Sequence, residues 1–146
     1  MDGPVAPPSA VLFICRMNAV RSPMAEALMG QLFPKSVYVR SCGVFAGVRD
    51  PFVDSVMDEI GISMEAHHPK TYDDLQEGGF DLIITLTPEA HHMALELTRT
   101  QHVDIVYWPT LDPTLVFGSR TQILDSYRQV RDSLRKRIID LMEPSP

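Results

Sequence analysis

The sequence predicts an α/β fold of three layers, in which a doubly wound, four-stranded parallel sheet carries helices on both faces. Apolar runs typical of buried strands alternate along the chain with segments of helical periodicity, and this alternation indicates a parallel sheet. Right-handed crossovers between the strands give the strand order 2-1-3-4. The strands are expected at residues 10–15, 37–42, 80–86 and 103–108.

Helices are expected at residues 22–32, 51–60, 88–99 and 120–142, with a short helical turn at 71–76. The last helix has the clearest period, because its apolar residues recur at threes and fours and form one stripe. The stripe consists of Ile123, Tyr127, Val130, Leu134, Ile138 and Leu141. Acidic residues are interspersed among the basic residues of this helix, so we interpret the basic ones as a solvated face rather than an interaction patch. They are Arg128, Arg131, Arg135, Lys136 and Arg137.

The most informative segment leads from the first strand into the first helix. Cys15 ends an apolar run, and Arg21 follows six positions later, where the helix begins. The unpaired N–H groups at a helix N-terminus and the positive end of the helix dipole favour an anion. We therefore expect a phosphate-binding loop, formed by Arg16, Met17, Asn18, Ala19, Val20, Arg21 and Ser22.

The residue types in this loop suit a nucleophile beneath a phosphate. The positive surroundings favour the thiolate form of Cys15, and the planar guanidinium of Arg21 can hold two phosphoryl oxygens. Ser22 can donate its hydroxyl to the sulfur, and Asn18 tolerates a left-handed backbone and can tie the loop together. A Cys-x5-Arg match alone also fits a buried cysteine and a solvated arginine. The strand, Asn18, the Arg-Ser-Pro sequence and the helix together favour the phosphate site.

This segment resembles the active-site loop of the low-molecular-weight protein tyrosine phosphatases, and of the arsenate reductases that share their fold. The resemblance extends over about residues 9–142 and includes Arg40-Ser41-Cys42-Gly43, Asp50-Pro51 and Leu111-Asp112-Pro113. It implies that Cys15 attacks phosphorus and Arg21 binds the phosphoryl oxygens. Asp112 would protonate the leaving oxygen and then activate water. An Asp-Pro pair by itself also fits an ordinary turn.

The resemblance also implies residues that support the loop. Ser41 matches a family serine that hydrogen-bonds the loop asparagine, here Asn18, and His67 matches a histidine that supports the same network; Ser22 completes the set. His67 also fits an ordinary surface or core histidine. In a parallel α/β sheet the carboxyl ends of the strands meet at one edge, where Cys15, Ser41, Thr87 and Asp112 should gather.

The sequence departs from the family pattern at the rim of the loop. Met17 stands where the family usually has glycine, and Arg16 where a small or apolar residue is common, so the rim should be bulkier and more basic. The tyrosines that follow the Asp-Pro pair in many of the phosphatases are missing. Four other side chains are candidates to rebuild an aromatic or apolar wall, and each also fits ordinary packing: Phe45, Trp108, Leu115 and Phe117.

The cysteines limit the redox chemistry. Val20 replaces the second cysteine that some family phosphatases place beside the nucleophile, and residues 87–97 lack the two cysteines of thioredoxin-coupled arsenate reductases. Cys42 is the only other thiol in the chain. We interpret Cys42 as buried and inert, with a disulfide to Cys15 as the alternative.

Length and composition indicate one ordinary globular domain. The chain has 146 residues, of which 45% are hydrophobic and 22% charged. We expect a flexible arm at residues 1–9, without signal-peptide features, and a single phosphatase-like domain at 10–146. A net charge of −6 argues against nucleic acid as a partner, and no stretch is long enough to span a membrane. The nucleophilic thiol suits the cytoplasm. No metal-ligand spacing occurs, and no cofactor is expected.

Three functions fit these observations. The favoured one is a metal-independent phosphatase that hydrolyses phosphotyrosine or small aryl phosphates through a cysteinyl-phosphate. The second is an arsenate reductase in which an external thiol or glutaredoxin completes the reduction. The third is a non-catalytic phosphate-binding regulatory module. The partner is accordingly a phosphorylated protein or a small phosphate or oxyanion.

Overall fold

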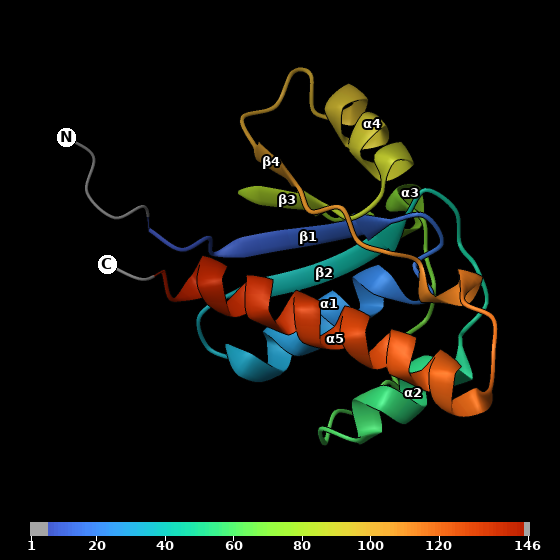
Figure 1. Cartoon of the computed structure of the whole chain (residues 1–146). Coiled ribbons are helices and arrows are strands. Elements are labelled where there is room, and N and C mark those ends of the chain that lie inside the picture. The colour runs from blue at the N-terminus through green and yellow to red at the C-terminus, as the bar shows by residue number, and fades with distance from the viewer. Residues whose placement is uncertain (1–5, 145–146) are drawn as a thin grey trace.

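The computed structural model describes residues 6–144 and confirms the predicted α/β fold (Figure 1). Four strands form one sheet in the order β2-β1-β3-β4, and all neighbouring strands are parallel. The strands are β1 (Ala10–Cys15), β2 (Tyr38–Gly43), β3 (Leu82–Thr85) and β4 (Asp104–Tyr107). The strand order is therefore the one that right-handed crossovers predict.

The helices lie on both faces of this sheet, as predicted. They are α1 (Arg21–Leu32), α2 (Pro51–Asp58), α3 (Tyr72–Leu75), α4 (Pro88–Leu97) and α5 (Arg120–Met142), and a 3-10 turn, η1 (Pro113–Leu115), precedes α5. In Figure 1, α1, α2 and α5 cover one face, and α4 lies on the other. None of the described helices has both the length and the apolar composition to cross a membrane.

Side-chain caps set where the helices begin. Asp50 Oδ1 accepts a hydrogen bond from the N–H of Phe52 before α2, and Thr87 Oγ1 accepts one from Ala90 in α4. Proline follows each of these two caps, where its fixed φ suits the first helical position. Ser119 opens α5 through a reciprocal capping box with Gln122.

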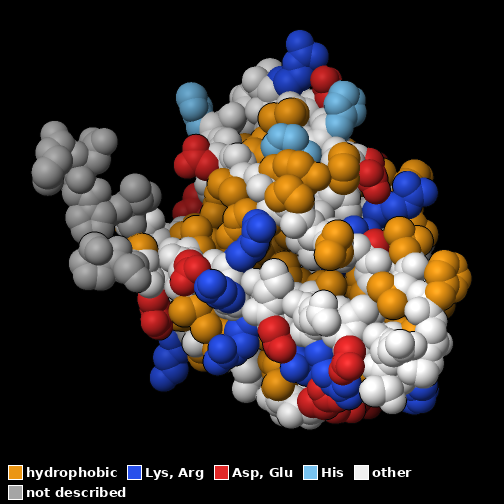
Figure 2. All heavy atoms as spheres, in the orientation of Figure 1, with side chains coloured by type: hydrophobic (Ala, Val, Ile, Leu, Met, Phe, Trp, Pro, Cys, Tyr) orange, Lys and Arg blue, Asp and Glu red, His pale blue; other side chains and the backbone are white. Residues whose placement is uncertain are grey.

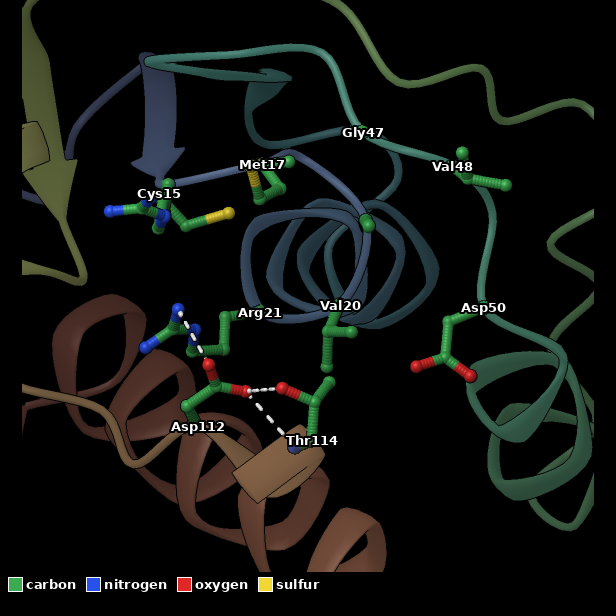
Figure 3. Close-up of a pocket in the computed structure, with 11 residues that line it drawn as sticks. Cys15, Met17, Val20, Arg21, Gly47, Val48, Asp50, Asp112 and Thr114 are labelled. Carbon is green, nitrogen blue, oxygen red and sulfur yellow. Dashed lines mark hydrogen bonds and ion pairs between the residues drawn. The ribbon is translucent and has the colours of Figure 1, made fainter.

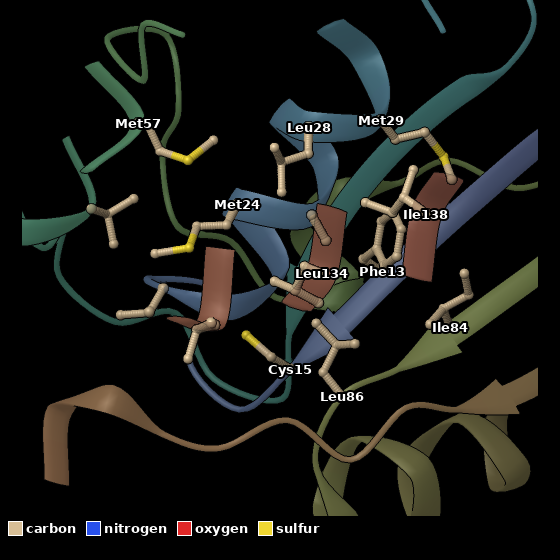
Figure 4. Close-up of a cluster of buried hydrophobic side chains, with 14 of the residues drawn as sticks. Phe13, Cys15, Met24, Leu28, Met29, Met57, Ile84, Leu86, Leu134 and Ile138 are labelled. Carbon is tan, nitrogen blue, oxygen red and sulfur yellow. The ribbon is translucent and has the colours of Figure 1, made fainter. Parts of the chain in front are cut away.

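The alternation of side chains along β1 builds a core on each side of the sheet. Phe13 and Cys15 face α1 and α5, whereas Leu12 and Ile14 face α4. Figure 4 shows Leu134 and Ile138 of α5 packed over this first face, next to Phe13. Cys15 therefore rests on a rigid strand with packed apolar side chains around it.

The predicted apolar stripe of α5 is present, with a shift at its end. Tyr127, Val130, Leu134 and Ile138 are buried, whereas Ile123 and Leu141 are only partly buried. Met142 is buried at the C-terminal end of the helix.

The prediction of a solvated basic face is wrong at Arg131. This side chain is only 8% exposed, and its Nη1 donates to the carbonyl of Val56 at 2.7 Å and to Glu59 at 2.8 Å. Val56 lies in the last turn of α2, where a carbonyl has no partner within the helix. Arg128 also binds Glu59, and these hydrogen bonds lower the pKa of Glu59 to about 2. The long arginine side chains therefore join α5 to the end of α2.

The predicted N-terminal arm, residues 1–9, lies partly outside the described residues, which begin at residue 6. At its end, the N–H and hydroxyl of Ser9 donate to Asp81 at 3.0 and 3.1 Å. The N–H of Tyr38 donates to the carbonyl of Ser9 at 2.8 Å. Hydrogen bonds to the sheet therefore begin at Ser9.

The arginine contact between α2 and α5 predicts a loss of stability when it is removed. Arg131→Met keeps the apolar stem but leaves the buried carbonyl of Val56 without its donor, so we expect the free energy of unfolding to fall by about 1–3 kcal/mol. Urea unfolding measures this change. Arg135→Met, on the exposed face one turn away, is the matched control and should stay within about 0.5 kcal/mol of the parent. Equal stability of the two variants would contradict the structural role of Arg131.

Candidate active site

The loop between β1 and α1 turns sharply over the N-terminus of α1 (Figure 3). Cys15 ends the strand and is buried, and Asn18 turns the chain with a left-handed backbone, at φ 53°. Val20 precedes α1, and no side chain within residues 6–144 caps the first N–H groups of this helix. These N–H groups and the positive end of the helix dipole are therefore available to an anion above Cys15.

Asn18 holds the loop in place through its side chain and its carbonyl. It is fully buried, and its Nδ2 donates to Ser22 Oγ at 2.8 Å and to Ser41 Oγ at 3.0 Å. Its Oδ1 accepts the N–H of Lys70 at 3.0 Å, and its carbonyl lies 2.9 Å from Nε2 of His67. The structure thus brings together all four residues expected to support the loop, and it adds the backbone of Lys70.

His67 enters this network as a neutral side chain. Burial lowers its pKa from the ordinary value, so the neutral form is favoured at neutral pH. Because the carbonyl of Asn18 can only accept, Nε2 carries the proton in this contact.

Glu26 is a member of the network that sequence reasoning missed. The hydroxyl of Ser41 donates to Oε1 of Glu26 at 2.5 Å. Burial raises the pKa of Glu26 more than this hydrogen bond lowers it. A glutamate on a helix is ordinarily solvated, but Glu26 follows Ser22 by four positions, which places it on the same face of α1. That spacing is the signal that could have indicated its position.

The hydroxyl of Ser22 serves two acceptors. Its Oγ lies 2.9 Å from Sγ of Cys15 and 3.3 Å from the carbonyl of Cys42. A hydroxyl has one proton, so Ser22 donates to the sulfur when Cys15 is a thiolate. When Cys15 is a thiol, its S–H can donate to Ser22, whose proton then turns to the carbonyl of Cys42. The N–H of Asn18 also donates to Sγ, at 3.3 Å.

Cys42 lies on the other face of the sheet from the nucleophile. The register pairs Cys42 with Ile14, and both side chains belong to the core beneath α4, whereas Cys15 faces α1. Both thiols are free, and burial raises the pKa of Cys42 to about 12. Opposite faces do not permit the Cβ approach that a disulfide requires, so the alternative of a Cys15–Cys42 bridge is wrong.

A pocket of about 360 Å³ opens above the loop, and Cys15, Arg21 and Asp112 meet in it (Figure 3). Nη2 of Arg21 lies 3.7 Å from Oδ2 of Asp112, and its Nη1 donates to the carbonyl of Thr110 at 3.0 Å. Oδ1 of Asp112 accepts the N–H of Thr114 at 3.0 Å and the hydroxyl of Thr114 at 2.6 Å. Oδ2 is therefore the oxygen that Asp112 presents toward Arg21 and the pocket.

The walls of the pocket are aliphatic and acidic. Its lining includes Met17, Val20 and Val48 and a second carboxylate, Asp50, which accepts the hydroxyl of Tyr127 at 2.5 Å. The four side chains considered for an aromatic or apolar wall are Phe45, Trp108, Leu115 and Phe117. None of them is among the described residues that line the pocket.

Arg16 and Met17 lie on the rim, where the sequence placed them. Arg16 is paired with Glu89 at 3.6 Å and lies over the ring of Phe45. The N–H of Gly47 donates to the carbonyl of Met17 at 2.8 Å, and a Cβ at Gly47 would lie 3.0 Å from the Cβ of Met17. Because Gly47 has no Cβ, the side chain of Met17 has room beside it.

Thr87, which we expected to gather with Cys15 and Asp112, does not line the pocket: it is buried and caps α4. Among residues 6–144, no group of three or more His, Cys, Asp or Glu side chains is placed to hold a metal ion.

The comparison with known families agrees with this geometry. The sequence model of the family described as "Low molecular weight phosphotyrosine protein phosphatase" matches residues 10–145. The chain belongs to this family.

Relatives within this fold have several activities. A glutaredoxin arsenate reductase of Synechocystis sp. is 26% identical over 132 residues, which cover 90% of this chain and 95% of that protein. A protein-arginine-phosphatase of Bacillus subtilis is 29% identical over an alignment that covers 90% of this chain and 93% of that protein. The structure of an arsenate reductase in a phosphate-binding state superposes with a TM-score of 0.77 at 26% identity, covering 92% and 96% of the two chains. Family membership thus leaves the substrate open.

The two thiols should differ sharply in reactivity. We expect iodoacetamide at neutral pH to label Cys15, which lines the pocket, and to leave Cys42, whose raised pKa and burial keep it a thiol. Peptide mapping by mass spectrometry identifies the labelled residue. Cys15→Ser should give no label when folded, and the unfolded parent should be labelled at both positions. Labelling of Cys42 in the folded chain would contradict its placement.

Proposed function

We propose that the chain is a metal-independent phosphatase that hydrolyses phosphotyrosine or small aryl phosphates through a cysteinyl-phosphate. The observation that carries the proposal is the meeting of Cys15, Arg21 and Asp112 in one pocket above the N-terminus of α1. A thiol, a bidentate cation and a carboxyl group are what the two half-reactions need. This combination favours a catalyst over a non-catalytic phosphate-binding module.

In the first half-reaction, the thiolate of Cys15 attacks phosphorus. The S–P bond forms as the P–O bond to the leaving group breaks, and Asp112 gives its proton to the departing oxygen. Arg21 and the loop N–H groups hold the other phosphoryl oxygens and stabilise their charge in the transition state. The hydroxyl of Ser22, 2.9 Å from the sulfur, stabilises the thiolate before attack.

In the second half-reaction, water attacks the phosphorus of the cysteinyl-phosphate. Asp112, now a carboxylate, takes a proton from that water, the S–P bond breaks, and inorganic phosphate and the thiolate form. Ser22 again donates to the sulfur, which makes Cys15 a better leaving group. Because Cys42 faces the other side of the sheet, it cannot form a disulfide that would rescue an oxidised Cys15. A thiol of this kind needs reducing surroundings, and we therefore place the protein in the cytoplasm.

Arsenate reduction is the second candidate. The aliphatic lining of the pocket offers no aromatic grip for a phenyl ring within the described residues, and arsenate needs none. Cys15 would attack arsenic, and the S–As bond would form as an As–O bond breaks and water leaves. An external thiol or glutaredoxin would then attack Sγ, and the S–As bond would break with its electron pair left on arsenic. That step forms a mixed disulfide and releases arsenite, with the two electrons supplied by the two sulfurs.

Phosphoarginine is a further substrate to test within the phosphatase proposal. Asp50 and Asp112 place two carboxylates in the pocket lining, and a guanidinium leaving group is a cation that they can attract. The protein-arginine-phosphatase of Bacillus subtilis is a relative of similar length.

The first functional test compares the two reactions directly. We expect turnover of p-nitrophenyl phosphate in the presence of a metal chelator, faster than arsenate reduction with glutathione and glutaredoxin. Cys15→Ser should lower that turnover by about 10⁴-fold or more and still bind phosphate, because Arg21 and the loop N–H groups remain. Phosphotyrosine and phosphoarginine peptides then rank the substrates. Undiminished turnover by Cys15→Ser would exclude the cysteinyl-phosphate, and faster arsenate reduction would favour the second candidate.

The role of Asp112 predicts a dependence on the leaving group. Asp112→Asn cannot supply a proton, so we expect kcat to fall by about 10²-fold or more for alkyl phosphates and much less for p-nitrophenyl phosphate. A series of substituted phenyl phosphates measures this as a steeper dependence on leaving-group basicity. Asp140→Asn, on an exposed position of α5, should give the parent slope. A uniform loss across the series would make Asp112 a structural residue instead.

A further inference from the structure

A second cavity, of about 400 Å³, adjoins the catalytic pocket between the Asp112 loop and α5. We call it the acid-loop groove, and it is lined chiefly by Pro109, Leu111, Asp112, Pro113, Val116 and Val130. Asp112 lines both cavities, so the groove and the catalytic pocket share one rim. Nothing in the proposed chemistry of Cys15 and Arg21 uses the rest of this groove.

The surface that the groove offers is neutral and largely apolar. Thr110 donates to the carbonyl of Trp108 at 2.8 Å and Ser126 to that of Ile123 at 2.6 Å, so these two hydroxyls are committed within the chain. Gln129 and Ser133 add exposed, uncharged polar groups to the lining. Asp112 is its one charged lining residue among those described, and its Oδ1 is already occupied by Thr114. Apart from Asp112, the lining offers a charged occupant only uncharged groups in place of its hydration, so an apolar side chain fits better.

Exposed apolar side chains lie on the segment that lines the groove. Leu111, which lines it, is 85% exposed, and Leu115 and Phe117, on either side of the lining residue Val116, are 70% and 92% exposed. Figure 2 shows hydrophobic side chains gathered beside α5, over the segment that leads into it. Contiguous exposed apolar surface on a folded chain marks an interaction site.

We propose that the acid-loop groove receives an apolar side chain that lies one or two residues from the phosphorylated residue of a protein substrate. The proposal rests on the proposed phosphatase activity. In that reaction the leaving oxygen lies against Oδ2 of Asp112, which lines both cavities, so a polypeptide that leaves the pocket on this side passes over the groove. An extended chain advances about 3.3–3.6 Å per residue, so the next side chain or the one after it reaches the groove. The substrate's own chain is therefore the occupant.

Paired phosphotyrosine peptides test the proposal. Two peptides differ only at the residues flanking the phosphotyrosine, with leucine in one and serine in the other, and kcat/KM is measured for both. We expect the parent to prefer the leucine peptide by about tenfold, as expected for apolar groups placed in an apolar site. Leu111→Ser and Val116→Ser, both at positions that line the groove, should lower this preference to about twofold. Since the preference is a ratio within each variant, a general loss of activity cancels.

The control variant is Leu95→Ser, at an exposed apolar residue on α4, across the sheet from the groove. It should keep the preference of the parent. Equal kcat/KM for the two peptides, or a preference that survives both groove variants, would overturn the proposal. So would a dimer in sedimentation that Leu111→Ser dissociates, since the occupant would then be a second copy of the chain.

The failure of this proposal and that of the phosphatase proposal look different. Turnover of p-nitrophenyl phosphate without a peptide preference would overturn only the groove. No turnover of p-nitrophenyl phosphate or of either peptide would overturn the phosphatase activity, and the groove proposal would fall with it.

Discussion

The geometry of the site depends on one residue in a left-handed backbone conformation, Asn18. Such a φ costs an L-residue about 1–2 kcal/mol, and it persists only where the surroundings fix it. Here the surroundings are Ser22 on α1, Ser41 on β2, and His67 and the backbone of Lys70 from the segment after α2. Three parts of the fold therefore converge on a single amide, and the sheet register that places Ser41 also shapes the anion-binding loop.

The network contains two partly buried titratable side chains, Glu26 and His67, and burial favours the uncharged form of each. Burial raises the pKa of Glu26 and lowers that of His67. The contribution of Glu26 to stability is present at a pH below 4.5, the ordinary pKa of its side chain, and is lost as the pH rises through the higher pKa that Glu26 has in the folded chain. The contribution of His67 is present at a pH above its ordinary pKa of 6.5 and is lost as the pH falls through the lower pKa that it has in the folded chain. Near neutral pH, His67 contributes fully, whereas Glu26 contributes only while its carboxyl stays protonated, with Ser41 linking it to Asn18.

Periodicity predicted the strands and helices, because alternating apolar runs have few ways to be buried, and the right-handedness of crossovers predicted the strand order. The loop residues were also foreseeable, since Cys15, Asn18 and Arg21 lie close together in sequence. Glu26 and Arg131 were not, because each is a charged residue on a helix whose burial depends on partners from distant segments. The fit of Gly47 against Met17 is likewise tertiary: the sequence shows that Met17 is bulky but not which segment makes room for it.

The pocket carries charges of both signs. Arg21 and the N–H groups of α1 attract a phosphoryl group, while Asp112, 3.7 Å from Arg21, and Asp50 add negative charge to the lining. The positive groups at the N-terminus of α1 orient any phosphate monoester with its oxygens toward Cys15. The aliphatic walls add contact area without the geometry that selects one ring over another. The two carboxylates can tell a cationic leaving group from a neutral one, but discrimination among sequences around the phosphorylated residue needs contacts beyond the pocket, and the surface next to Asp112 is where apolar contacts are available.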